Sequence, residues 1–121
     1  MEESILTSIK KLLGIEKDYE QFDQDIIMHI NSSLMSLNQL GVGPKKAFAI
    51  ANSGASWKDL LGDTTMFEGV KTYIYLKVRL VFDPPTNSYV MDSIKEQIKE
   101  LEWRLTTQAE EGVELNDTES K

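Results

Sequence analysis

The sequence of 121 residues contains no cysteine and only one histidine, His29. Disulfides and thiolate metal sites are therefore excluded, and a single histidine is too few for the usual zinc ligand sets. No nucleophile motif surrounds any serine, and no glycine-rich phosphate loop follows a predicted strand. We expect His29 to be a half-exposed surface residue. The sequence predicts no catalytic site, no metal and no cofactor, so we do not expect an enzyme.

Long apolar runs and basic residues are also scarce. No stretch approaches the ~18 to 20 apolar residues that span a bilayer, so no membrane contact is expected. Lysine and arginine number 13 against 20 acidic residues, for a net charge of −7. The last thirteen residues carry −4 of this charge, which leaves −3 on residues 1–108. Tight DNA binding depends on cationic side chains that neutralise phosphates, and this balance argues against it.

Apolar residues recur at helical spacing along most of the chain, which predicts an all-α fold, a small bundle of about four to five helices. The first, third and fourth expected helices cover about 5–13, 57–61 and 66–82. The second begins between 18 and 23 and ends at 40, and the fifth follows a cap at 86, 87 or 88 and ends near 108. Glycines and the Asp-Pro-Pro at 83–85 mark several helix ends. Residues 41–56 are turn-rich and form an irregular or short-strand insert. We predict a helical domain over 1–108 and a disordered, acidic, flexible tail over 109–121.

The segment LGVGPKKAFAIANSG, residues 40–54, contains a possible nucleic-acid motif. Its Gly-x-Gly turn, followed by Lys45 and Lys46, resembles a helix–hairpin–helix turn that binds a DNA phosphate through backbone N–H groups. A small DNA-binding protein that uses this turn at 41–47 is the alternative hypothesis. However, Asn-Ser-Gly interrupts the segment too early for a second helix, and such motifs commonly act in pairs. We favour a structural turn after a helix end at Gly41.

The last predicted helix carries a large aromatic side chain on its outward face. Trp103 falls opposite the apolar stripe of that helix, and tryptophan is enriched at interface hot spots. Tyr89, Asp92, Glu96 and Lys99 share the same outward arc. We predict that this face contacts a partner protein or a neighbouring subunit.

Two further features also predict contact with a partner. Met28 and Met35 lie on the face of the second helix that points away from its apolar stripe, and methionine is an adaptable contact residue. Lys77 points into the apolar arc of the helix at 66–82. We expect Lys77 to pair with an acid, within the chain or across a subunit boundary.

Several motifs occur together in one order along the chain. They are LxxLGVG at 37–43, WKDLLGD at 57–63, VKTYIYLKVRLVFDPP at 70–85 and ELEWRL at 100–105. This order resembles the head–tail connector (adaptor, head completion) family of long-tailed bacteriophages and their prophages. The resemblance covers about residues 4–106, and the run that ends in Phe-Asp-Pro-Pro is its most specific part.

The resemblance implies a structural virion protein at the head–tail interface, made in the host cytoplasm. Such a protein assembles as a homo-oligomeric ring, twelve-fold like the portal protein, beneath the portal after DNA packaging. The ring extends the DNA channel and offers a docking platform for the stopper or tail-completion protein. Packaged DNA passes through without specific binding, and Lys45 and Lys46 would lie in a loop near the lumen or DNA.

Overall fold

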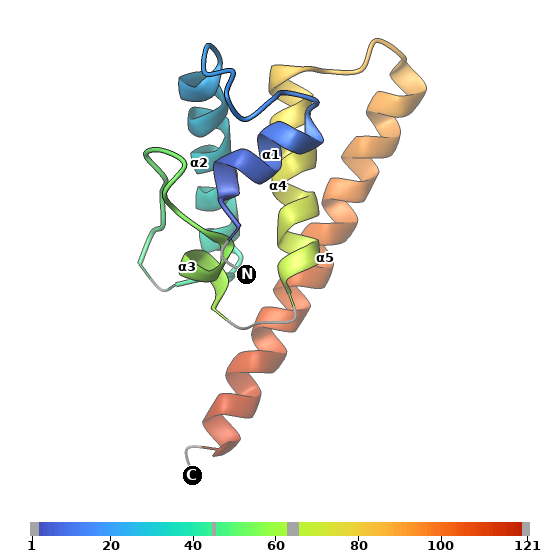
Figure 1. Ribbon diagram of the computed structural model, residues 1–121. Helices are drawn as coiled ribbons and strands as arrows, with labels where there is room; N and C mark the ends of the chain where they lie inside the picture. Colours follow the sequence, from blue (N-terminus) through green and yellow to red (C-terminus); the bar gives the residue numbers. More distant parts are fainter. Residues whose placement is uncertain (1–2, 45, 63–65, 120–121) are drawn as a thin grey trace.

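The computed structural model describes residues 3–44, 46–62 and 66–119, with only the backbone over 111–119. It contains five helices: α1 (Ile5–Leu12), α2 (Asp23–Gln39), α3 (Trp57–Leu61), α4 (Phe67–Phe82) and α5 (Ser88–Glu119). Within the described ranges the single β pairing is one isolated bridge between Ser4 and Ser56. The predicted all-α fold class is confirmed (Figure 1).

Local signals explain where the helices begin and end. The Ser4 hydroxyl accepts a hydrogen bond from the Thr7 N–H at the start of α1. A reciprocal capping box between Ser56 and Asp59 starts α3, so even this five-residue helix has a defined first turn. Gly14 follows α1 with φ of 82°, a left-handed conformation that favours glycine. The helix ends predicted from the sequence are therefore produced by ordinary capping chemistry.

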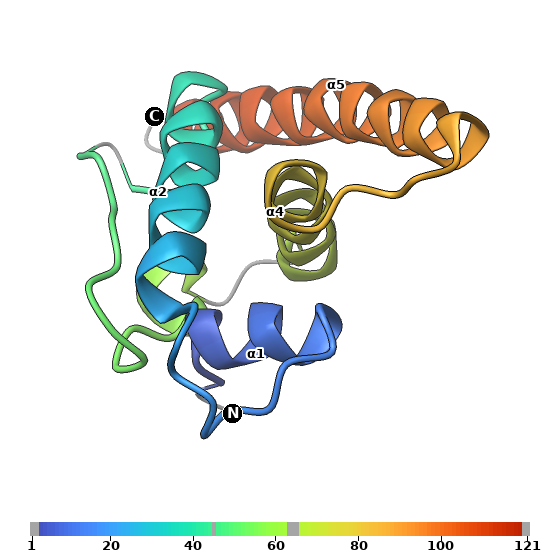
Figure 2. The same ribbon diagram turned by 90° about the horizontal axis from the view of Figure 1, so that it is seen from above.

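Helix α4 forms the centre of the bundle. Figure 2 shows α2, α1 and α5 arranged around it on three sides, with the fourth side open. Four of its residues, Val70, Tyr73, Ile74 and Val78, are fully buried. So are Ile26 and Ile30 of α2 and Ile5 and Ile9 of α1. The wide apolar arc of α4 is thus explained by its several neighbours.

The insert between α2 and α3 is irregular, as one of the two sequence alternatives expected. No strand forms in its described part, 41–44 and 46–56. Asn31 of α2 holds the insert by two hydrogen bonds to Ile50, one to the carbonyl at 3.0 Å and one from the N–H at 2.8 Å. Where the insert ends, the Trp57 indole donates to the Ser8 hydroxyl inside the core. The loop is therefore tied to the bundle at defined points.

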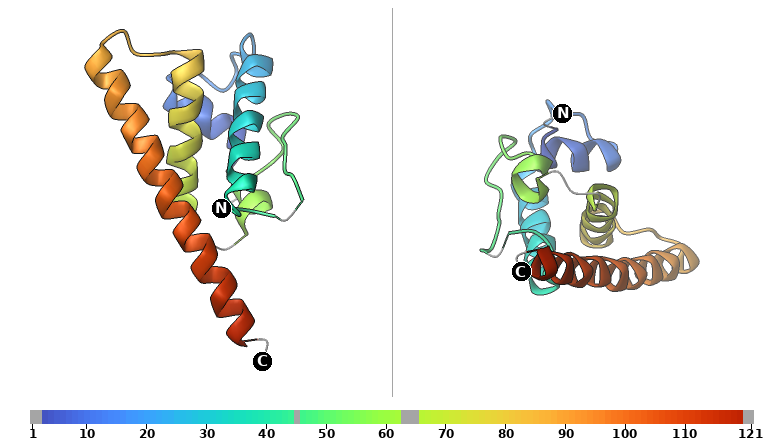
Figure 3. Two further views of the ribbon diagram at one scale, coloured as in Figure 1. Left: turned by 180° about the vertical axis from the view of Figure 1, so that it is seen from behind. Right: turned by 90° about the horizontal axis from the view of Figure 1, so that it is seen from below.

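Helix α5 differs from the prediction at both ends. Its helical backbone continues to Glu119, whereas the apolar pattern predicted a helix end near 108 and disorder beyond it. Alanine, glutamate and leucine in the segment after 108 are strong helix formers. The helix can therefore extend beyond the end of its apolar stripe. Figures 1 and 3 show this end projecting past the other helices. The division into a connector domain (1–108) and a flexible tail (109–121) stays a prediction.

The first turn of α5 is also more exposed than the apolar stripe predicted. Val90 belongs to the predicted apolar stripe, yet 41% of its surface is exposed. In Figure 2 the start of α5 lies out beyond α4, away from α2, so no helix covers that turn. Ile94, Ile98 and Leu105 of the same stripe are buried as predicted.

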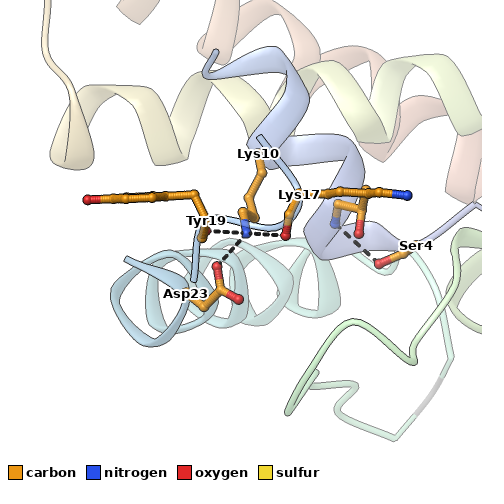
Figure 4. Close-up of polar contacts among 6 residues, drawn as sticks. Ser4, Lys10, Lys17, Tyr19 and Asp23 are labelled. Atoms are coloured by element: carbon orange, nitrogen blue, oxygen red, sulfur yellow. Dashed lines mark hydrogen bonds and ion pairs between the residues drawn. The ribbon is translucent and has the colours of Figure 1, made fainter. Parts of the chain in front are cut away.

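A buried lysine that the sequence analysis did not identify joins α1 to the start of α2. Lys10 is 2% exposed, and its ammonium donates to the carbonyls of Lys17 at 3.0 Å and Tyr19 at 2.7 Å. It also lies 2.7 Å from Asp23 Oδ1 (Figure 4). Two carbonyl acceptors and one carboxylate of opposite charge thus surround the ammonium, which is how a lysine can be tolerated inside a protein.

Candidate protein-interaction surfaces

The outward face of α5 carries the exposed aromatic residues that the sequence analysis singled out. Trp103 is 69% exposed and Tyr89 is 86% exposed. Tyr89, Asp92, Ser93 and Glu96 line a shallow groove at the first turns of this face. Glu96 and Lys99 form an exposed ion pair at 3.9 Å. The predicted exposure of this face is confirmed, and its role in an interface stays a prediction.

A buried hydrogen bond fixes α5 against the bundle. Tyr73 is fully buried on α4, and its hydroxyl donates to Glu102 Oε2 of α5 at 2.8 Å. Burial raises the pKa of Tyr73 far above its usual range, and the hydrogen bond and negative charge of Glu102 raise it further. A hydrogen bond with Ser36 of α2 opposes the rise. This contact therefore joins three helices and sets which faces of α5 remain exposed.

The stability of the protein is expected to fall as the pH rises above about 10, because of Tyr73. Its pKa is higher in the folded chain, so the unfolded chain releases the proton first. The contribution is fully present below about pH 10 and is lost above it, by up to ~1.4 kcal/mol per pH unit. Tyr73→Phe has no such proton, so its unfolding free energy should decline less steeply. Urea unfolding between about pH 9 and pH 11 tests this, and equal slopes would contradict it.

The outer face of α2 carries two exposed methionines, with the exposed Ser32 between them. Met28 and Met35 are 59% and 63% exposed, as expected for residues opposite the buried stripe. Between Ile26 and Gln39 the helix contains no acidic or basic residue apart from His29, which is half-buried. An interface core is typically depleted of charge and enriched in methionine. We name the surface of Met28 and Met35 the methionine ridge.

Lys77 does not form the acid pair that the sequence analysis expected within this chain. Its ammonium lies 5.7 Å from the centre of the Tyr73 ring, a cation–π arrangement. Among the described residues it makes no ion pair, and the buried ion pair belongs to Lys10 instead. The Tyr73 ring, one turn before Lys77, supplies the negative face there. Pairing across a subunit boundary stays a prediction.

A second groove, which the sequence analysis missed, runs between α4 and α5. It has a volume of about 180 Å³ and is lined by Thr72 from α4 and by Gln97, Glu100, Leu101 and Arg104 from α5. Leu101 supplies its apolar floor, while Arg104 and Glu100 form an ion pair of 2.7 Å at its rim. The sequence assigned Leu101 to the buried stripe and so gave no signal of a groove. We name this surface the α4–α5 groove.

The glycine turn at 41–47 does not lead into a helix. Gly41 and Gly43 have φ of 84° and 91°, and Asn38 of α2 donates to the Pro44 carbonyl at 3.1 Å. Over 44 and 46–55 the backbone is irregular until α3 begins at Trp57, so the second helix of a helix–hairpin–helix is absent there. Lys46 is exposed, and Lys45 lies outside the described residues. The geometry agrees with a structural turn.

A metal site and a membrane-spanning helix are two further features that the described ranges could contain. Within 3–44, 46–62 and 66–119, no three histidine or acidic side chains gather where they would hold a metal ion. No helix in that part of the chain has the length and apolarity of a membrane span.

A comparison with known families identifies the chain. A family model described as "Phage connector protein" matches residues 5–112, which is most of the chain. The chain belongs to the phage connector protein family. It is therefore a structural component of the phage head–tail connection, and the resemblance predicted from the sequence motifs is confirmed. The curated proteins and solved structures compared with it contain no match.

Membership in this family implies contact with portal and tail components of the virion. The outer face of α5, the methionine ridge and the α4–α5 groove are exposed surfaces of this chain, and their roles in those contacts stay predictions.

Proposed function

We propose that this phage connector protein is the ring-forming adaptor below the portal. The ring extends the DNA channel and provides the docking platform for the stopper or tail-completion protein. One observation carries the proposal: Trp103, 69% exposed, lies on an otherwise charged face of α5 in a chain of the connector family. A tryptophan at such a position is typical of an interface hot spot, which becomes buried when the partner binds.

Two separate exposed faces support assembly into a closed ring. The outer face of α5 and the methionine ridge lie on different helices and differ in composition, because one is charged around its aromatics and the other lacks charge. A heterologous interface, in which one face meets a different face of the next copy, generates rings when the rotation closes. We propose a twelve-fold ring, which matches the portal symmetry that the family resemblance implies.

The charge of the chain suits a channel through which DNA slides. Residues 88–119 of α5 carry nine acids and three bases, so this helix holds −6 of the total of −7. An acidic surface repels the phosphate backbone, whereas clustered lysines would retain it. DNA is therefore expected to pass without specific binding, and Lys45 and Lys46 contribute at most weak contacts.

Sedimentation tests this proposal directly. Labelled protein is mixed with purified portal of the same phage and, in parallel, with duplex DNA at low and moderate salt. We expect co-sedimentation with the portal and none with DNA. Binding to DNA that weakens steeply with salt, without binding to the portal, would instead support the alternative of a DNA-binding protein.

A further inference from the structure

The insert between α2 and α3 contains a short extended segment, residues 47–50. Exposure alternates along it, because Ala47 and Ala49 are exposed, Phe48 is half-buried and Ile50 is buried. Alternation with a period of two is typical of a β-strand that rests one face on a core. The chain bends at 46 and again at 51, which limits the extended run to these four residues. The segment therefore has the form of a strand, although no other part of the described chain pairs with it as a strand.

A side chain of α2 occupies one edge of this segment. The Asn31 amide accepts a hydrogen bond from the Ile50 N–H at 2.8 Å and donates one to the Ile50 carbonyl at 3.0 Å. In an antiparallel sheet, the residue opposite Ile50 on an adjacent strand would make the same two hydrogen bonds. Asn31 thus takes the place of a neighbouring strand on the side of α2, and Figures 1 and 2 both show the insert lying beside that helix.

The opposite edge of the segment, which we name the outer edge, is open. In an extended chain the N–H and C=O groups of successive residues point to opposite edges. Because those of Ile50 point toward α2, those of Ala49 and Ala47 point away from it. Neither alanine makes a backbone hydrogen bond to any other residue that the structure describes. Two exposed N–H donors and two exposed carbonyl acceptors are therefore available at the outer edge.

The outer edge also lacks the features that usually prevent an exposed edge from pairing. Such edges commonly carry a lysine, a proline or a bulge. Residues 47–50 are Ala-Phe-Ala-Ile, without charge or proline, and Lys46 lies just before them. The small side chains of Ala47 and Ala49 leave room for a second backbone. This edge is suited to β-augmentation, in which an extended peptide joins as an additional strand.

We propose that an extended segment of the tail-side protein, the stopper or tail-completion protein, adds to the outer edge as a second strand. The added strand accepts hydrogen bonds from the N–H groups of Ala47 and Ala49 and donates to their carbonyls. The proposal rests on the adaptor function proposed above and specifies how that adaptor holds the next protein of the virion.

Other segments of the same chain are poor candidates for the added strand. Residues 3–5 are already hydrogen-bonded to 55–57. In the segment between α1 and α2, the carbonyls of Lys17 and Tyr19 accept from Lys10. Residues 83–87 contain two adjacent prolines, which have no N–H to donate.

The geometry of a ring and the other exposed surfaces narrow the choice of partner further. Pairing of the outer edge with the same edge of another copy is a two-fold contact, which does not generate a ring of many subunits. The outer face of α5 and the methionine ridge are proposed above for the portal and ring contacts. Membership in the connector family implies tail components as the other class of partner, and the outer edge is available for them.

The variant Ala49→Pro tests the outer edge. Proline removes the N–H of residue 49 and places its ring at that edge, while its φ near −65° suits an extended chain. The Ala49 N–H has no partner among the described residues, so urea unfolding should be unchanged. Heads carrying the variant connector are mixed with purified tail-side protein of the same phage. We expect its binding to weaken about ten-fold or more, because one carbonyl of the added strand loses its donor.

The matched control is Ala49→Val. Valine is similar in size to proline and favours a strand, but it keeps the backbone N–H. This variant should bind the tail-side protein as the unmodified chain does. Normal binding by Ala49→Pro would overturn the proposal. An equal loss with Ala49→Val would also overturn it, because the side chain and not the backbone edge would then make the contact.

Hydrogen exchange of the unmodified chain gives a second readout that does not depend on the fold of a variant. Amides without a hydrogen bond exchange rapidly, so exchange over 47–50 should slow when the tail-side protein binds. Exchange over these residues that is the same in free and bound connector would overturn the proposal.

The same samples identify a wrong partner and separate this proposal from the proposed function. If Ala49→Pro weakens attachment to the portal but not to the tail-side protein, the edge does not bind the partner proposed here. Dimers of the free chain that Ala49→Pro abolishes would show self-pairing of the edge and also overturn the proposal. If the unmodified chain attaches to neither portal nor heads, the proposed function itself fails.

Discussion

Trp103→Ala is expected to weaken attachment to the portal or head by about 30-fold or more while leaving the fold intact. Truncation of a hot-spot tryptophan typically costs at least about 2 kcal/mol of binding free energy, which corresponds to that factor. The side chain is 69% exposed, so the free energy of unfolding should change by less than about 0.5 kcal/mol. Attachment is measured by co-sedimentation over a concentration series, and folding by circular dichroism and urea unfolding.

A matched control distinguishes the Trp103 face from exposed apolar surface in general. Leu12 of α1 is also exposed, but α1 and α5 lie on opposite sides of α4 (Figure 2). Leu12→Ala should attach normally, and Trp103→Phe should retain part of the affinity because it keeps a flat apolar ring. Normal attachment of Trp103→Ala would show that this face is not the docking surface.

Lys10→Met should produce the largest loss of stability among the variants considered, about 3 to 5 kcal/mol. The substitution removes the ion-pair partner of Asp23, whose Oδ1 is buried and accepts no hydrogen bond, and the donor to two backbone carbonyls. Domains of this size have a total stability of about 5 to 15 kcal/mol, so the variant is expected to be close to unfolding. Urea unfolding followed by the fluorescence of the buried Trp57 measures the loss.

Two further variants attribute the effect to the ion pair. Lys11→Met removes the neighbouring exposed lysine and should change stability by less than about 0.5 kcal/mol. In Lys10→Met with Asp23→Asn, the buried charge that lost its partner is also removed, so the double variant should be more stable than Lys10→Met alone. A loss below about 1 kcal/mol for Lys10→Met would mean that the site repacks or admits water.

The contacts of Lys10 also affect the path of the chain between α1 and α2. By binding the carbonyls of Lys17 and Tyr19, Lys10 sets the course of the chain into α2. At the start of α2, the Phe22 ring contacts that of Tyr19 in a tilted arrangement at 5.6 Å and that of Phe82 edge-on at 5.4 Å between centroids. The direction of α2, and with it that of the methionine ridge, depends on this end of the structure.

The helical architecture was predictable because its signals are local. Apolar spacing of 3.6 residues, capping serines and the glycines and prolines at helix ends depend only on residues within a few positions of one another. The exposure of Trp103, Met28 and Met35 followed from the same periodicity. The family resemblance was also carried by short motifs, and these are matched by the family model over 5–112.

Contacts between distant parts of the chain were decided by the tertiary structure alone. The Tyr73 ring beside Lys77 is an exception, because the two residues lie one turn apart on α4 and helical spacing alone could have indicated their contact. Asn31 and Ile50 are 19 residues apart, and Tyr73 and Glu102 are 29 apart, so no local pattern links them. The α4–α5 groove exists because two helices cross, and Leu101 looks like any core residue until both are placed. Local periodicity thus determines which helices form and which residues point outward, whereas the packing of those helices determines which outward residues share a surface.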